Sequence, residues 1–187
     1  MPSVGGSSLR QREAVTPREQ IGVRGRVHEI HRKPEVAQEH GLPKPAVPEA
    51  RLTREGVAGD FNRYRHEEKR DDPDMAVLIV PLETLRELNG EGWPVQSGDL
   101  GENLTTEGIS NDAFVPGRKF RVGETVVEVS KECTPCTNLY LLPYVGEARG
   151  PAFLQATLGR RGWYARVLQD GLVCAQDPVE LLAEGDR

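Results

Sequence analysis

The chain is poor in cysteine and in aromatic residues, and it has no long apolar run. Only 3 of its 187 residues are cysteine, and 5% are aromatic. Three cysteines are too few, and an odd number, for the disulfide framework of a small secreted domain. With so few aromatic side chains, the core must be built from Val, Leu, Ile and Ala. No apolar run approaches the roughly 18 residues of a membrane helix, so we expect no membrane span.

Concentrated positive charge is also missing. The chain has 24 Lys and Arg against 29 Asp and Glu, a formal net charge of −5, and the two signs are mixed along most of it. Nucleic acid is therefore not an expected partner. There is no Gly-x-Gly-x-x-Gly motif and no P-loop, which removes support for the two commonest nucleotide sites. Residues 1–20 contain no apolar segment of a signal peptide, so we expect a cytoplasmic protein.

Short strands make up most of the predicted structure. Alternating apolar residues from Ile21 to Val27 predict a first strand, and the run MAVLIV at 75–80 predicts a buried one. Two helices are expected, PLETLREL from Pro81 and PAFLQATL from Pro151. The class is therefore β-rich α+β, a barrel or sandwich with flanking helices. Further strands are expected at 51–57, 118–122, 125–129, 162–168, 172–175 and 179–182, with Gly123-Glu124 as a two-residue hairpin turn.

Three segments are expected to lack regular structure. Residues 1–18 are rich in Gly, Ser, Arg and Glu and are predicted to form a mobile N-terminal arm, which leaves 19–187 as a single domain. Residues 34–50 contain four prolines, which exclude a helix or an interior strand. Residues 60–70 are densely charged, and we expect a surface loop there.

The stretch KECTPCTNL at 131–139 holds two of the three cysteines. A thiol reacts or binds metal as the thiolate, which a helix N-terminus or a nearby cation favours. Cys136 precedes Thr137-Asn138-Leu139, a predicted first turn of a helix whose N–H groups and dipole would stabilise the sulfur anion. Cys133 lies three residues earlier, within reach as a resolving thiol. Cys136 and Cys133 are therefore the candidate catalytic residues.

Other interpretations of this pair stay open. Both cysteines can be small buried hydrophobes with no chemistry. A zinc site needs four ligands, and beyond the pair the chain offers distant Cys174 and four histidines, of which His28 and His31 are near each other. Thioredoxin-like chemistry needs its Cys-x-x-Cys in a β-α-β context, whereas this one lies two thirds of the way along a β-rich chain.

A second unusual stretch is GDLGENLTTEG at 98–108. Gly98 and Gly101 permit tight turns and close approach of the backbone. Such a loop can bind a polar ring system or a phosphate, or it can be a structural turn that its own Asp and Asn side chains stabilise. The basic pair Arg160-Arg161 suits phosphate, although such a cluster is also typical of a solvated face. The polar side chains that the loop presents are Asp99, Glu102, Asn103, Thr105 and Thr106.

Taken together and in order, these stretches resemble a known family. GDLGENLTTEGI, an apolar strand, CTPCTNL, and GRRGWYARVL with a glycine three residues later resemble the MOSC domain, the C-terminal domain of molybdenum cofactor sulfurases. The chain looks most like the small stand-alone bacterial members, and GVAGD at 56–60 resembles their upstream Gly-Asp motif. The resemblance spans residues 20–182 and implies a MOSC-like β-barrel with flanking helices.

The resemblance also implies a cofactor and roles for residues. Cys136 matches the family's Pro-Cys cysteine, which is proposed to ligate molybdenum in the pterin cofactor or to carry a persulfide. Thiolate ligation of molybdenum is chemically reasonable. Related proteins, including the mitochondrial amidoxime-reducing component, reduce N-hydroxylated compounds with this cofactor. The implied contacts to the molybdenum cofactor (molybdopterin) are Gly101, Glu102, Asn103, Thr105, Thr106, Arg160 and Arg161.

Two departures from the larger family members define the expected partners. The chain is too short to hold their pyridoxal-phosphate domain, and it lacks the cluster-binding cysteines of an appended ferredoxin domain. We therefore expect a cysteine desulfurase or an electron-donor protein as partner. Three functions follow: a molybdenum-dependent reductase of N-hydroxylated compounds, a sulfur carrier with a persulfide on Cys136 for delivery to a cofactor or metal–sulfur cluster, or a non-catalytic binding module.

Overall fold

The computed structural model describes residues 23–36, 39 and 41–183. Its strands are β1 (Arg24–His31), β2 (Ala46–Val47), β3 (Glu49–Thr53), β4 (Gly56–Val57), β5 (Val77–Pro81), β6 (Leu104–Glu107), β7 (Lys119–Val122), β8 (Thr125–Glu132), β9 (Trp163–Gln169), β10 (Gly171–Cys174) and β11 (Pro178–Leu181). Its α-helices are α1 (Leu82–Gly90) and α2 (Gly146–Thr157). Shorter helical turns cover Tyr64–Glu68, Pro73–Met75, Asn111–Ala113 and Thr137–Leu141. The predicted N-terminal arm, residues 1–18, lies outside the described residues.

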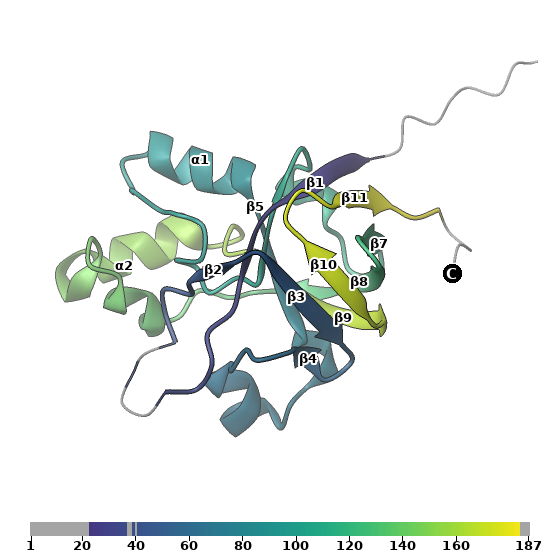
Figure 1. Ribbon diagram of the computed structural model, residues 1–187. Coiled ribbons are helices and arrows are strands. Elements are labelled where there is room, and N and C mark those ends of the chain that lie inside the picture. Colours follow the sequence, from purple (N-terminus) through teal and green to yellow (C-terminus); the bar gives the residue numbers. More distant parts are fainter. Residues whose placement is uncertain (1–22, 37–38, 40, 184–187) are drawn as a thin grey trace, which may run out of the picture.

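Among the described residues, seven strands close into a barrel (Figure 1). Their order is β11-β7-β8-β9-β5-β6-β1, and β11 pairs back onto β1. Every neighbouring pair in the ring is antiparallel except β5 and β6, which run parallel. Closure leaves the ring without an open edge. Strand β2 extends β1, and β3, β4 and β10 form a separate three-stranded sheet.

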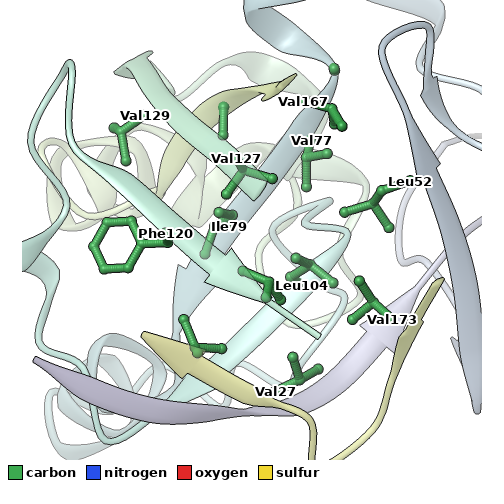
Figure 2. Close-up of a cluster of buried hydrophobic side chains, with 14 of the residues drawn as sticks. Val27, Leu52, Val77, Ile79, Leu104, Phe120, Val127, Val129, Val167 and Val173 are labelled. Carbon is green, nitrogen blue, oxygen red and sulfur yellow. The ribbon is translucent and has the colours of Figure 1, made fainter. Parts of the chain in front are cut away.

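The barrel interior is built mainly from branched aliphatic side chains, as the shortage of aromatic residues predicts. Figure 2 shows Val, Leu and Ile side chains of the barrel strands meeting there with Leu52 of β3, Val173 of β10 and the ring of Phe120. The Phe120 ring stacks on Phe114 at 4.9 Å between centroids. Burial of each such side chain is worth about 1.5–3 kcal/mol, so this cluster is the main source of stability.

Strand β5 is buried at every position, because different neighbours cover its two faces. Val77 and Ile79 belong to the barrel core, whereas Val80 belongs to a second apolar cluster under the helices. Figure 1 shows α1 and α2 together on one side of the barrel, where their apolar side chains cover it. The second cluster comprises Val80, Leu85, Leu88, Val95, Leu100, Leu139, Leu142, Val145 and Phe153.

Most of the predicted elements are confirmed. The run at 75–80 supplies most of β5 and the segment 162–168 most of β9, and Gly123 opens the hairpin between β7 and β8 with a φ of 54°. The predicted strand at 51–57 is instead split into the hairpin β3–β4. The proline-rich segment carries the short edge strand β2, and β3 begins at Glu49, directly after its last proline. None of the helices formed by the described residues is long and apolar enough to cross a membrane.

The predicted start of the second helix, at Gly150-Pro151, was wrong. Helix α2 begins at Gly146, so Pro151 lies inside it. Proline has a helical φ, and in the second turn it forgoes only one backbone hydrogen bond. The ring of Tyr140 packs so closely against Gly150 that a side chain at this helical position would collide with it. The glycine therefore marks a packing contact and not a helix boundary.

The charged segment 60–70 was predicted to be a surface loop, but it is partly helical and partly buried. It contains the π-helical turn Tyr64–Glu68, and Arg65 is 9% exposed. The Arg65 guanidinium donates hydrogen bonds to the carbonyl oxygens of Glu55 (2.6 Å), Asp71 (3.0 Å) and Asp72 (2.9 Å). A buried arginine that satisfies three carbonyls ties this segment to the turn between β3 and β4.

Candidate functional site

A cavity of about 680 Å³ lies beside the barrel, within the size range of small-molecule sites. Four segments meet around it: the end of β8, the cysteine segment that follows it, the turn at 61–64, and the stretch 98–108, called the glycine loop below. Cys133, Cys136 and Arg161 are among its lining residues, so the structure brings both candidate cysteines to one wall. Leu78 of β5 and Tyr164 of β9 form part of the apolar wall.

The sulfur of Cys136 is hydrogen-bonded to Arg161. The Nη1 atom of Arg161 lies 3.1 Å from Cys136 Sγ and also donates to the carbonyl oxygen of Thr134, at 2.9 Å. Cys136 is exposed, whereas Arg161 is 8% exposed. Burial lowers the pKa of Arg161, but the adjacent Cys133 and Cys136 more than offset this, so its pKa is raised and it stays charged. A fixed cation beside a thiol favours the thiolate.

The predicted helix after Cys136 is a single five-residue 3-10 segment, Thr137–Leu141. Cys136 precedes it in extended conformation, and its side chain makes no capping hydrogen bond there. A helix dipole acts through aligned peptide units, and one turn supplies little of it. The stabilising group at the sulfur is therefore the Arg161 side chain and not the predicted helix N-terminus.

Cys133 is a different kind of thiol. It is 1% exposed and packs with Met75, Leu78 and Tyr164. Burial raises the pKa of the Cys133 thiol, which Arg161 and Tyr164 only partly counteract. Its backbone N–H donates to the Gly162 carbonyl, which ties the cysteine segment to β9. Cys133 is thus a neutral group of the cavity wall, beside the exposed sulfur of Cys136.

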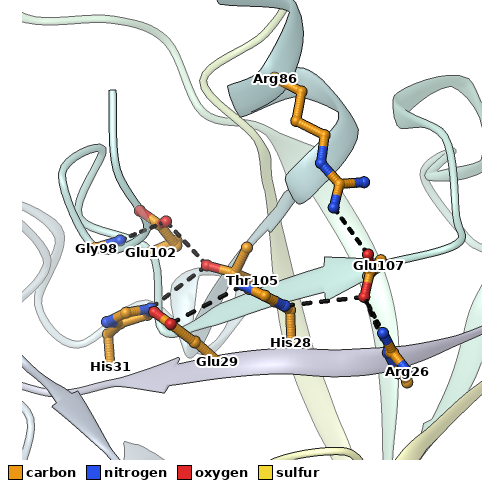
Figure 3. Close-up of polar contacts among 9 residues, drawn as sticks. All are labelled: Arg26, His28, Glu29, His31, Arg86, Gly98, Glu102, Thr105 and Glu107. Carbon is orange, nitrogen blue, oxygen red and sulfur yellow. Dashed lines mark hydrogen bonds and ion pairs between the residues drawn. The ribbon is translucent and has the colours of Figure 1, made fainter. Parts of the chain in front are cut away.

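Of the glycine-loop residues predicted to contact a cofactor, only Gly101 lines the cavity. Glu102, Thr105 and Thr106 are fully buried and do not line the cavity. Figure 3 shows Glu102 accepting hydrogen bonds from the Gly98 N–H (2.7 Å) and the Thr105 hydroxyl (3.1 Å). Burial raises the pKa of the Glu102 carboxyl. These side chains shape the loop, and any effect they have on a ligand is indirect.

Asn103 is also a buried residue that supports the fold. Its Oδ1 accepts from the Leu78 N–H (3.1 Å), while its Nδ2 donates to Asp60 Oδ2 (2.9 Å) and to the His31 carbonyl (3.3 Å). Asn103 is 4% exposed and does not line the cavity. Asn103 touches the cavity wall indirectly, through its bond to the backbone of Leu78 and through Asp60, which is bonded to the wall residue Lys44.

The two predicted arginines are separated although they are adjacent in sequence. Arg161 lines the cavity, but Arg160 does not. The Arg160 guanidinium makes two hydrogen bonds to Glu91, at 2.6 and 2.9 Å. The carboxylate of Glu91 raises the pKa of Arg160 and anchors this side chain to the end of α1. Of these two arginines, only Arg161 lies where it can contact a molecule in the cavity.

Sequence reasoning missed Lys44 and Asp60. Lys44 lies in the proline-rich segment, and Asp60 lies in the stretch taken for a surface loop. Lys44 is 6% exposed, and the Asp60 side chain is 7% exposed. The available signal was Gly59 before Asp60 in the Gly-Asp motif, because Gly59 has a φ of 79° and so marks a fixed backbone position. Nothing comparable in the sequence distinguishes Lys44.

Within the described part of the chain, no cluster of three or more His, Cys, Asp or Glu side chains could hold a metal ion. The thiol that could ligate a soft metal carried by a cofactor is Cys136, because it is exposed on the cavity wall beside a cation. A site of this kind needs most of its ligands from the cofactor itself.

The model of the MOSC domain family matches residues 58–180. The chain belongs to the MOSC domain family. It is 32% identical to the uncharacterised protein YflK of Bacillus subtilis over 78% of this chain, and 31% identical to YiiM of Escherichia coli over 72%. It spans 64% of the length of YflK and 60% of that of YiiM. The predicted family is confirmed.

Solved structures confirm the predicted MOSC-like barrel. The crystal structure of E. coli YiiM has a TM-score of 0.60 to this MOSC chain, with 28% identity over 86% of this chain and 70% of that one. A protein of Gibberella moniliformis named "Reductase" is 35% identical over 46% of this chain, which is 15% of its own length.

Proposed function

We propose that this MOSC protein binds the molybdenum cofactor, with Cys136 as a ligand of the metal, and reduces N-hydroxylated compounds. The observation that carries the proposal is the 3.1 Å contact between Arg161 Nη1 and Cys136 Sγ on the wall of a cavity of about 680 Å³. An exposed thiolate is a soft ligand of the kind that molybdenum accepts.

The residues around the cavity fit such a cofactor. Its pterin carries a phosphate, and the lining contains more cationic than anionic side chains. Arg161 has a further polar atom, Nε, that is buried without a hydrogen-bond partner among the described residues. Gly101 lines the cavity, and its φ of 86° is a backbone conformation that glycine adopts without strain.

In this proposal the cofactor supplies a metal that can accept and release electrons, and the protein supplies the surroundings. The Arg161 guanidinium, hydrogen-bonded to the sulfur of Cys136, fixes the position of this sulfur. The apolar wall of Leu78 and Tyr164 limits access of water to the ligand. The relative named "Reductase" supports reduction as the reaction class. A separate electron-donor protein would complete the turnover.

The test uses full-length protein produced in a host that makes the cofactor. We expect reduction of a simple amidoxime to its amidine with a reduced viologen dye as electron source. Cys136→Ser should abolish it, and Cys174→Ser, which changes a cysteine outside the cavity, should retain it. Equal activity in Cys136→Ser and in the native protein would refute the role of Cys136.

A second function, sulfur carriage, is favoured by the contrast between the two thiols. Cys136 is exposed and Cys133 is buried, so of these two sulfurs a donor can reach only that of Cys136. The Cys136 thiolate would attack the terminal sulfur of a persulfide on a cysteine desulfurase, forming a new S–S bond as the donor thiolate leaves. Mass spectrometry after incubation with desulfurase and cysteine should show one added sulfur on Cys136. An unmodified Cys136 would exclude sulfur carriage. If the amidoxime is not reduced either, the remaining function is that of a non-catalytic binding module.

A further inference from the structure

A buried tyrosine faces the cavity from the outside of the barrel. Tyr164 of β9 is 9% exposed, packs with Leu78 and Cys133, and lines the cavity. Its neighbours in the strand, Trp163 and Ala165, pack on the barrel core instead. Because successive side chains of a strand point to opposite faces, this pattern places the Tyr164 ring on the cavity side.

The hydroxyl of Tyr164 lies at the cavity wall. Cys133, Arg161 and Asn62 are among the side chains that act on this hydroxyl, and all three line the cavity. The Nη1 atom of the same Arg161 lies 3.1 Å from the sulfur of Cys136. One cation is therefore close to both the sulfur and the hydroxyl. A molecule that binds beside Cys136 comes within reach of the Tyr164 hydroxyl.

Tyr164 is protonated and shielded from water, as a proton donor in a closed site must be. Burial and the adjacent Cys133 raise the pKa of Tyr164, and Arg161 counteracts this only in part, so the hydroxyl keeps its proton at neutral pH. The other tyrosine of the lining, Tyr64, is 48% exposed and open to water. Tyr164 is thus the buried phenol of this cavity.

The lysines of the lining are less suited to donate a proton. Lys44 and Lys131 each donate to a carboxylate, at 2.6 Å to Asp60 and at 2.7 Å to Asp72. Loss of a proton from either ammonium would leave its carboxylate without the paired cation, which is unfavourable. Lys69 is exposed on the surface.

We propose that Tyr164 is a catalytic residue of this cavity, which donates a proton to the oxygen of an N-hydroxylated substrate as that oxygen leaves. The inference rests on the proposed function, which supplies the reaction. The N–O bond of an amidoxime breaks with two electrons that come from the reductant through the bound cofactor. The leaving hydroxide takes one proton from the Tyr164 hydroxyl and becomes water, and the nitrogen takes a second proton from solvent.

A weak acid is sufficient for this step. The oxygen leaves as hydroxide, the conjugate base of water, whose pKa is about 15.7. The phenolate that forms lies beside Arg161, whose positive charge stabilises it. The phenolate then regains its proton from solvent, which completes the balance of two electrons and two protons for each amidine and water formed.

The first experiment measures binding without turnover. Molybdenum-loaded protein without reductant is titrated calorimetrically with benzamidoxime and with benzamidine, the reduced product. Tyr164→Phe should bind benzamidoxime about threefold more weakly than the native protein does, because one hydrogen bond to the hydroxyl oxygen is lost. Benzamidine lacks that oxygen and should bind both proteins alike. Equal dissociation constants of the two proteins for benzamidoxime would overturn the proposal.

The second experiment measures turnover with a reduced viologen dye. The kcat of Tyr164→Phe should fall about 100-fold, the usual contribution of a general acid. The control is Tyr140→Phe, which changes a tyrosine outside the cavity and should keep the native kcat. All three proteins should carry the same amount of molybdenum. Equal kcat values in the two variants, or loss of molybdenum from Tyr164→Phe, would contradict the assignment.

The pH profile separates proton donation from a structural role. The ionisable groups beside the Tyr164 hydroxyl are Cys133, Arg161 and, opposite on β8, Lys131. The native protein and Tyr164→Phe share these groups, so the ratio of their kcat values isolates the hydroxyl. Because the variant must take its proton from hydronium, this ratio should rise about tenfold per pH unit between about pH 6 and 8.

Imidazole buffer, a small proton donor, should restore part of the activity of Tyr164→Phe at fixed pH. A kcat ratio that depends neither on pH nor on imidazole would mean that Tyr164 has only a structural role. A native protein that carries molybdenum but reduces no amidoxime would refute the proposed function, and the role of Tyr164 with it. A native protein that reduces amidoxime no faster than Tyr164→Phe does would refute the role of Tyr164 alone.

Discussion

The guanidinium of Arg161 lies 3.1 Å from the sulfur of Cys136, although 25 residues separate them in the chain. Strand β9 and the end of β8 pair as neighbours in the barrel, with Glu132 opposite Trp163, and this pairing brings the two residues together. The barrel thus places a permanent cation, itself shielded from water, against a thiol that a ligand can reach.

The first prediction concerns the reactivity of this thiol. Arg161→Gln should slow the alkylation of Cys136 by iodoacetamide at neutral pH by about tenfold, because the charged hydrogen bond from the guanidinium to the sulfur is lost. Arg160→Gln is the matched control, since Arg160 bonds Glu91 outside the cavity. Peptide mass spectrometry over time gives the rate for each cysteine. Equal rates in Arg161→Gln and Arg160→Gln would show that the contact does not activate the sulfur.

The buried carboxyl of the glycine loop gives a prediction on pH. Burial raises the pKa of Glu102 above its ordinary value of 4.5, so the folded state binds this proton more tightly than the unfolded state does. The contribution of the group to stability is therefore fully present below about pH 4.5 and is lost as the pH rises through the raised pKa. As the pH rises from about 4.5 through the raised pKa, the free energy of unfolding of the native protein should fall relative to that of Glu102→Gln.

Urea unfolding at several pH values between 4.5 and 8 measures this difference. The exposed Glu147→Gln is the control and should follow the native protein at every pH. A native protein that gains stability over Glu102→Gln as the pH rises would show that Glu102 is held as a favourable charge, contrary to this account.

Two glycines with nearly the same backbone conformation test how tightly the glycine loop is packed. Gly98 and Gly92 have φ values of 89° and 90°. A Cβ at Gly98 would collide with the Lys44 carbonyl and lie 2.9 Å from His31 Nδ1, whereas a Cβ at Gly92 would meet nothing within 4 Å. Gly98→Ala should therefore cost about 2 kcal/mol more in the free energy of unfolding than Gly92→Ala. Equal costs, measured by urea unfolding, would mean that only the backbone conformation matters and that the loop can move.

Much of the fold could be predicted because its signals are local. The run at 75–80, the helix at Pro81 and the turn at Gly123-Glu124 depend on patterns of a few neighbouring residues. The start of α2 could not be predicted in this way. It depends on how Tyr140 packs on Gly150, a contact that the sequence does not reveal.

The site was predictable only where a motif identified it. Cys136, which the resemblance implied, lies on the cavity wall together with Cys133 and Arg161, but the sequence does not distinguish Arg161 from Arg160. The buried partners of the polar loop residues also lie far away along the chain. Asn103, for instance, bonds Asp60, which is 43 residues distant. Such long-range pairs decide which polar side chains face a ligand and which support the fold.

The most direct test of the central claim, that Cys136 ligates molybdenum, is elemental analysis of purified protein from a cofactor-competent host. The native protein and Cys174→Ser should each carry close to one molybdenum per chain, and Cys136→Ser should carry almost none. Thermal unfolding of all three proteins verifies that the variants are folded. The same molybdenum content in Cys136→Ser as in the native protein, or no molybdenum in any of the three, would contradict the account.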